Sequence, residues 1–229
     1  MRPLPRLAPG DLSAWARDYA YAARQLRDPR PASAATYRRP AGDLPAVVLL
    51  PGVYERWTFL RPLADLLAGE GYDVHVVEAL RYNRGSVAAM AAIVDAYLRR
   101  AALPRVVLVA HSKGGLVGKY LLAHHNADGA LRGLVAVNTP FGGSSLARLL
   151  PLRALRTFVP GSPELVALSR EERVNRHIVS VYGTFDPHIP GGSHLDGARN
   201  VQVAARGHFL PLGDPLVHRA ILDAVASFA

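Results

Sequence analysis

The chain contains no cysteine, and lysine occurs only twice among its 229 residues. Without cysteine there is no disulfide framework, no thiolate metal site and no cysteine nucleophile. No apolar run approaches the roughly 20 residues that a membrane-spanning helix needs. Arginines and prolines interrupt the first 25 residues, where a secretory signal has about 7 to 15 consecutive apolar residues. These absences predict a cytoplasmic protein without a transmembrane segment.

Acidic side chains are fewer than basic ones, and the formal net charge is +9. The excess is carried by 25 arginines, which are scattered without a basic run longer than the pair at 38–39 and without interleaved aromatic residues. Such a distribution does not predict nucleic-acid binding. Eight of the arginines lie in the first 39 residues. Peripheral contact of this arm with an anionic membrane surface therefore stays open as an alternative to simple solvation.

Regular patterning covers most of the chain but not its beginning. We predict an N-terminal arm over 1–45, ending in a linker rich in proline and alanine, and one domain over 46–229. Within the arm, the spacing of apolar residues predicts a helix over 11–27 that docks on the domain, with Asp11 or Ser13 as its cap. The apolar stripe of this helix consists of Trp15, Tyr19, Ala22 and Leu26.

Short apolar runs rich in valine alternate with helix-like stretches in the domain. The runs are predicted as buried strands at 46–50, 72–77, 105–110, 133–138, 177–183 and 199–203. The helices are predicted at about 57–69, 86–101, 112–125 and 215–228. This alternation indicates right-handed crossovers and a parallel sheet covered on both faces. Residues 139–176 are too long for a bare loop and are predicted to carry short helices over one end of the sheet.

Ser112 stands between a predicted strand and a predicted helix, in the pentad AHSKG. In a doubly wound sheet, functional groups gather at the carboxyl ends of the strands. Ala110 and Gly114 are small at the two positions where strand and helix backbones approach a strained serine, so the pentad departs from G-x-S-x-G by one methyl group. We predict Ser112 as a nucleophile, with His111 packed beside it and taking no part in proton transfer.

A serine hydroxyl is a weak nucleophile at neutral pH and needs a base and an orienting acid. Asp186 follows the fifth predicted strand and His208 follows the sixth, so the chain order is Ser, Asp, His. Asp186 is the candidate acid, with Asp196 as the alternative. His208 is the candidate base, with His188 and His194 as alternatives.

Two backbone N–H groups are candidates for stabilising an oxyanion. One belongs to Lys113, at the start of the helix after the serine. The other belongs to Val53, in the loop after the first strand, where Gly52 allows close approach of a substrate and Pro51 stands where a histidine often precedes this glycine. The Lys113 side chain either attracts an anionic group, lowers the pKa of the imidazolium, or points outward.

Together these segments resemble an α/β-hydrolase of the bacterial lipase and esterase type, over residues 46–228. The segments AHSKGGLVGKYLL, LVAVNTPFGGSSLA, VYGTFDPHIP and GHFLPLGDP occur in that family's order. The resemblance implies an α/β fold with a mostly parallel central sheet, helices on both faces and a short helical cover after the sixth strand. It also implies a cofactor-free serine hydrolase with Ser112, Asp186 and His208 as its triad. The first 40 residues fall outside the resemblance.

A carboxylic ester with a hydrophobic acyl chain, as a small molecule or a lipid, is the expected substrate. The segment NTPFGGS and the apolar cover at 139–176, a possible lid, favour it. The same constellation serves thioesterases, amidases and acyltransferases, and a non-catalytic protein that binds lipids or acyl ligands is a further alternative. No His, Asp or Glu spacing predicts a metal. Tyr54, Trp57 and Phe59 either wall an acyl pocket or form the buried face of a helix.

Overall fold

The computed structural model of the chain describes residues 9–30, 33–40, 42–149 and 152–229, with the backbone alone for 9–11. In this part of the chain six strands form one sheet in the order β2-β1-β3-β4-β5-β6. All neighbouring strands pair in parallel. The strands are β1 (Ala46–Leu50), β2 (Val74–Val76), β3 (Val106–His111), β4 (Leu131–Val137), β5 (Ile178–Phe185) and β6 (Arg199–Arg206). The predicted parallel sheet is therefore confirmed.

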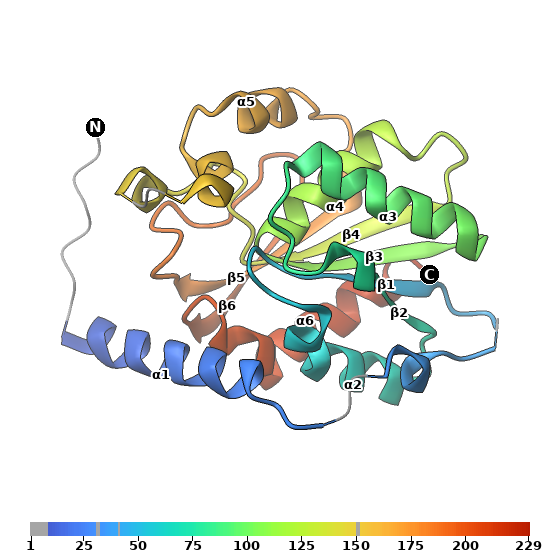
Figure 1. Cartoon of the computed structure of the whole chain (residues 1–229), viewed down its shortest axis with the longest axis horizontal. Coiled ribbons are helices and arrows are strands. Elements are labelled where there is room, and N and C mark those ends of the chain that lie inside the picture. Colours follow the sequence, from blue (N-terminus) through green and yellow to red (C-terminus); the bar gives the residue numbers. More distant parts are fainter. Residues whose placement is uncertain (1–8, 31–32, 41, 150–151) are drawn as a thin grey trace.

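Helices cover both faces of the sheet (Figure 1). Helices α3 (Val87–Ala101) and α4 (Lys113–His124) lie on one face, and α2 (Arg61–Gly69) and α6 (Pro215–Ala226) lie on the other. The first turn of the predicted helix at 57–69 is a 3-10 helix, Trp57–Leu60. Asp214 caps α6, since its Oδ1 accepts the Leu216 N–H at 2.8 Å.

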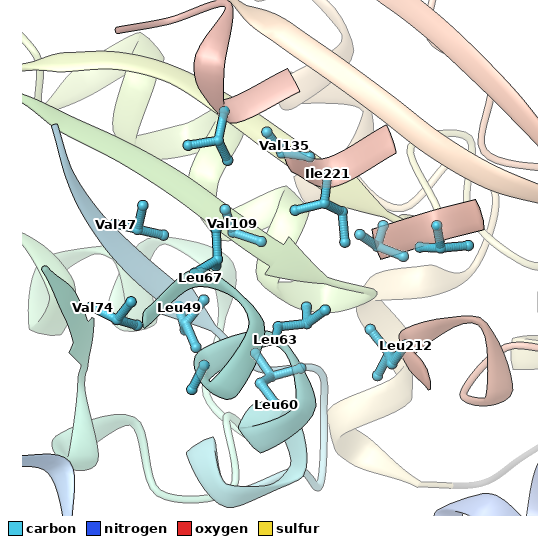
Figure 2. Close-up of a cluster of buried hydrophobic side chains, with 14 of the residues drawn as sticks. Val47, Leu49, Leu60, Leu63, Leu67, Val74, Val109, Val135, Leu212 and Ile221 are labelled. Atoms are coloured by element: carbon cyan, nitrogen blue, oxygen red, sulfur yellow. The ribbon is translucent and has the colours of Figure 1, made fainter. Parts of the chain in front are cut away.

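The apolar runs of the strands are continuous because both faces of the sheet are buried. Every residue of β1 is buried, with Val47 and Leu49 on one face and Val48 and Leu50 on the other. Figure 2 shows the first of these two cores, where strand valines meet leucines of α2 and Ile221 of α6. The two cores fix the sheet, and so the positions at which its strands end.

The segment 139–176 carries short helical elements, as predicted, and lies outside the description only at 150–151. It contains 3-10 helices at Ser145–Leu149, Arg153–Phe158 and Asn175–His177, and helix α5 (Pro163–Ser169). It follows the fourth strand of the chain, β4, so the expected place after the sixth strand is wrong. The reason is topological, because β6 leads through the 3-10 helix Leu210–Gly213 directly into α6, whereas the long crossover between β4 and β5 carries the cover.

Helix α1 (Pro9–Leu26) packs beside the sheet, below the face that carries α2 and α6 (Figure 1). It begins before residue 11, so Asp11 and Ser13 lie inside the helix and neither is its cap. Among its side chains from residue 12 onward, Ala14, Asp18 and Ala22 are buried, whereas Leu26 of the predicted stripe is 65% exposed. The helix therefore docks as predicted, but through a face with a carboxylate at its centre. Residues 1–8 of the predicted arm lie outside the described residues.

Within the described ranges, no helix combines the length and the apolar character needed to cross a bilayer.

Candidate active site

Ser112 occupies a strained corner between β3 and α4. Its φ is 50° and its ψ is −120°, a conformation that non-glycine residues rarely adopt. The corner is held by Ser112 N–H, which donates to the Val137 carbonyl at 2.9 Å, and by Thr139 Oγ1–H, which donates to the Ser112 carbonyl at 3.0 Å. A Cβ at Gly114 would overlap the Leu50 carbonyl oxygen. Glycine is therefore required there, which is the close approach that the sequence predicts.

The structure brings Ser112, Asp186 and His208 together at the carboxyl end of the sheet. His208 Nε2 lies 3.0 Å from Ser112 Oγ, and His208 Nδ1 lies 2.7 Å from Asp186 Oδ2. The other Asp186 oxygen accepts the N–H groups of His188 at 2.8 Å and Ile189 at 3.1 Å. The Asp186 carboxylate is thereby fixed in the orientation that receives the imidazole.

The environment of His208 favours its charged form. Burial of the ring disfavours the imidazolium, yet the charge and hydrogen bond of Asp186 outweigh this effect and raise the pKa of His208 above its usual 6.5. Glu55 and Asp18 act in the same direction through their charges. A raised pKa strengthens His208 as a proton acceptor for the hydroxyl beside it.

The alternative acid and bases do not meet the serine. Asp196 and His194 pair with each other at 3.1 Å on the surface, where both side chains are exposed. His188 packs against the His208 ring with centroids 4.8 Å apart. Burial and the charge of His208 lower the pKa of His188 to about 4, so His188 is neutral at pH 7.

The two candidate oxyanion donors lie on segments that touch each other, Lys113 at the start of α4 and Val53 on the loop after β1, because Gly114 packs directly against the carbonyls of Leu50 and Pro51. Neither the Val53 N–H nor the Lys113 N–H donates to a protein acceptor among the described residues. The N–H of Gly52, by contrast, donates to Glu55 Oε2 at 2.7 Å. The geometry thus leaves the two predicted donors available.

The Lys113 side chain is buried, so the alternative in which it points outward is wrong. Its Nζ donates to the carbonyl of Asn83 at 2.9 Å and to that of Gly85. Asn83 Nδ2 in turn donates to the Pro51 carbonyl at 2.7 Å. Desolvation lowers the pKa of Lys113 to about 8. The ammonium therefore ties the loop after β2 to the elbow and is occupied by backbone oxygens.

Sequence reasoning missed Glu55 and Asn138, two buried side chains whose hydrogen bonds support the site. Glu55 Oε1 lies 2.8 Å from His111 Nδ1, and His111 Nε2 donates to the His208 carbonyl at 3.0 Å. Asn138 Nδ2 donates to the same carbonyl at 3.0 Å. His111 does pack beside the elbow, but as a link between the first loop and the His208 backbone. In the sequence, the one indication of these contacts is the position of Glu55, three residues after Gly52 in the first loop.

The aromatic residues of the first loop divide between core and surface. Trp57 and Phe59 are buried in the core, which confirms their reading as the buried face of a helix, and Tyr54 is 39% exposed. Over the described ranges, no group of three or more His, Asp or Glu side chains is placed to hold a metal ion.

Among the comparisons with known proteins, only those of structure identify the fold. No protein-family model matches the chain, and no curated protein matches it in sequence. A lipase from Bacillus licheniformis in its mature form matches with a TM-score of 0.66 and 18% identity, over 82% of this chain and 94% of that chain. An extracellular alpha/beta-hydrolase from a Paenibacillus species matches with a TM-score of 0.58 and 17% identity, over 78% and 98%. The chain has the α/β-hydrolase fold.

The match extends to other members of this fold. An enol-lactonase from Burkholderia xenovorans has a TM-score of 0.55 and 17% identity, over 83% of this chain and 93% of that chain. In α/β-hydrolases the nucleophile stands on the turn between a strand and a helix, and the acid and histidine follow it in chain order. In this chain Ser112 stands on the turn between β3 and α4, and Asp186 and His208 follow β5 and β6 in that order.

Proposed function

We propose that this α/β-hydrolase is a serine hydrolase that cleaves carboxylic esters through an acyl-enzyme. One observation carries the proposal: two consecutive hydrogen bonds run from Ser112 through His208 to Asp186 at a strained corner. A hydroxyl, an imidazole and a carboxylate in this order form the arrangement that activates serine for attack on an acyl carbon.

The proposed reaction moves one proton back and forth. Ser112 Oγ attacks the ester carbonyl carbon while its proton passes to His208 Nε2. The Val53 and Lys113 N–H groups stabilise the oxyanion, and Asp186 stabilises the imidazolium. His208 then gives the proton to the leaving alcohol oxygen, which departs. Water repeats the sequence on the acyl-enzyme and releases the carboxylic acid, so ester and water become acid and alcohol without a cofactor.

The exposed apolar side chains of the cover support an apolar acyl chain in the substrate. The cover at 139–176 exposes Leu149 and Leu152, while Phe158, Leu165 and Leu168 join the second core. An apolar segment over the carboxyl end of the sheet would shield a hydrophobic chain from water. The names of two similar structures, a lipase and an enol-lactonase, also denote enzymes of ester substrates. Thioesterase and acyltransferase activity on the same triad remain the alternatives in this proposal.

The test is hydrolysis of p-nitrophenyl esters from C2 to C16, with Ser112→Ala beside the wild type. Ser227→Ala is the matched control, because Ser227 is an exposed serine at the far end of α6. We expect turnover that peaks at one chain length, is abolished in Ser112→Ala and is unchanged in the control. Acyl-thioesters of the same length separate ester from thioester preference. Tight binding of an acyl ligand without turnover in either protein would favour the non-catalytic binding protein.

A further inference from the structure

Helix α1 reaches the loop that carries His208. Asp18, in the middle of the helix, is 0% exposed. Its Oδ1 accepts the N–H of Phe209 at 2.8 Å and the N–H of Leu210 at 2.7 Å. These are the two residues that follow His208. One carboxylate oxygen from outside the sheet therefore holds the backbone next to the proposed base.

The loop is shaped around this carboxylate. Gly207 has a φ of +122°, and a Cβ there would come within 2.5 Å of Asp18 Oδ1. The His208 carbonyl accepts from His111 Nε2 and Asn138 Nδ2, each at 3.0 Å. The backbone of His208 is thus clamped between two donors from the strand ends and one acceptor from α1.

Asp18 also brings a buried negative charge. Its Oδ2 has no hydrogen-bond partner among the described residues. Asp186, Glu55 and Asp18 act on His208 through their charges, and the rings of His188 and His111 pack against the His208 ring. A buried carboxylate stabilises a nearby cation more strongly than one in water does.

We propose that Asp18 is a positioning residue for the reaction: it fixes the His208 loop through two N–H groups, and its charge stabilises the imidazolium that forms during attack. Helix α1 is then an integral part of the active site and not only a docked arm. Trp15 and Tyr19 complete the contact, with ring centroids 6.0 Å and 5.6 Å from that of His188. This inference rests on the proposed hydrolase function.

Two substitutions separate the two parts of this role. Asp18→Asn keeps a carbonyl oxygen for the two N–H groups and loses the charge. Asp18→Ala loses both. Asp223→Asn is the matched control, because it removes an exposed carboxylate from α6. All variants are compared by kcat, by KM, by the pH profile of kcat/KM and by the folded fraction from denaturation curves.

We expect Asp18→Asn to move the acidic limb of the kcat/KM profile to lower pH by roughly half a unit or more, because one of the charges that favour the imidazolium is gone. We expect Asp18→Ala to lower kcat by about tenfold or more with KM changed less than threefold, since the base is no longer held. The control should match the wild type. Unshifted limbs, or losses of activity equal to the loss of folded protein, would overturn the proposal.

An independent readout keeps this inference apart from the proposed function. The titration of His208 is followed by NMR on protein labelled at the histidine Cε1 carbons, with the signal assigned by His208→Gln. If no ester is turned over by the wild type, the proposed function fails, and the NMR titration still decides the role of Asp18. A lower pKa of His208 in Asp18→Asn than in the wild type supports the role, and an equal pKa overturns it.

Discussion

Glu55 joins the first loop to the elbow through a buried carboxylate, and its replacement gives a quantitative test. Its Oε2 accepts the Gly52 N–H at 2.7 Å, and its Oε1 lies 2.8 Å from His111 Nδ1. The His208 carbonyl can only accept, so His111 Nε2 carries a proton. A further proton must therefore lie between His111 Nδ1 and Glu55 Oε1.

Glu55→Ala leaves the Gly52 N–H and His111 Nδ1 buried without partners. Each such group costs about 1–3 kcal/mol, so we expect the free energy of unfolding to fall by about 2–6 kcal/mol. Glu55→Gln satisfies both groups, because its amide oxygen accepts from Gly52 and its amide nitrogen donates to neutral His111. We expect this variant to lose less than about 1 kcal/mol.

The assay is urea denaturation at pH 7.5, followed by tryptophan fluorescence. Glu70→Ala serves as the control, since Glu70 is exposed after α2 and its loss should cost less than about 0.5 kcal/mol. The reasoning is refuted if Glu55→Ala stays within about 1 kcal/mol of the wild type, or if Glu55→Gln is as damaging as Glu55→Ala.

Three further predictions concern the elbow, a buried lysine and the proposed base. Gly114→Ala forces a methyl group onto the Leu50 carbonyl, so we expect a loss of about 3 kcal/mol or more in urea denaturation and a collapse of esterase activity; a stable, active variant contradicts this. Burial lowers the pKa of Lys119 from 10.5 to about 8. Below pH 8 the buried side chain is charged and destabilises the fold, and this penalty decreases as the pH rises from 8 to 10.5. Lys119→Met should accordingly be more stable than the wild type at pH 7 by about 1–3 kcal/mol, with a smaller difference at pH 10; a less stable variant at pH 7 would refute the sign. Because His208 accepts a proton only when neutral, kcat/KM should rise with pH around a midpoint above 6.5, and a midpoint well below that value would count against the assignment.

Local sequence patterns were sufficient to predict much of the fold and of the candidate site. Valine-rich runs such as 106–111 are buried on both faces, so apolar composition alone locates them as strands. Ser112, Asp186 and His208 each follow a strand, and parallel strands place their carboxyl ends at one edge. Their proximity therefore follows from topology without any knowledge of side-chain packing.

The residues that sequence reasoning missed act through contacts between distant segments. Asp18 and Phe209 are 191 positions apart, and no local signal marks a carboxylate on an amphipathic helix as a buried acceptor. For Lys113 the sequence left three roles open, none of them a buried structural contact, because lysine is rarely buried; folding places two backbone carbonyls around its ammonium. The apolar stripe predicted for α1 was partly wrong for a similar reason, because the face of the helix that packs against the domain is centred on Asp18.

The most direct test of the proposed chemistry is the site of covalent modification by a fluorophosphonate. The wild type and Ser112→Ala are treated with the reagent, digested with trypsin and analysed by mass spectrometry. We predict one phosphonyl adduct in the wild type, on the peptide of residues 106–113 that contains Ser112, and none in the variant. A wild type that stays unmodified, or an adduct that persists in Ser112→Ala, would contradict the assignment of Ser112 as an activated nucleophile.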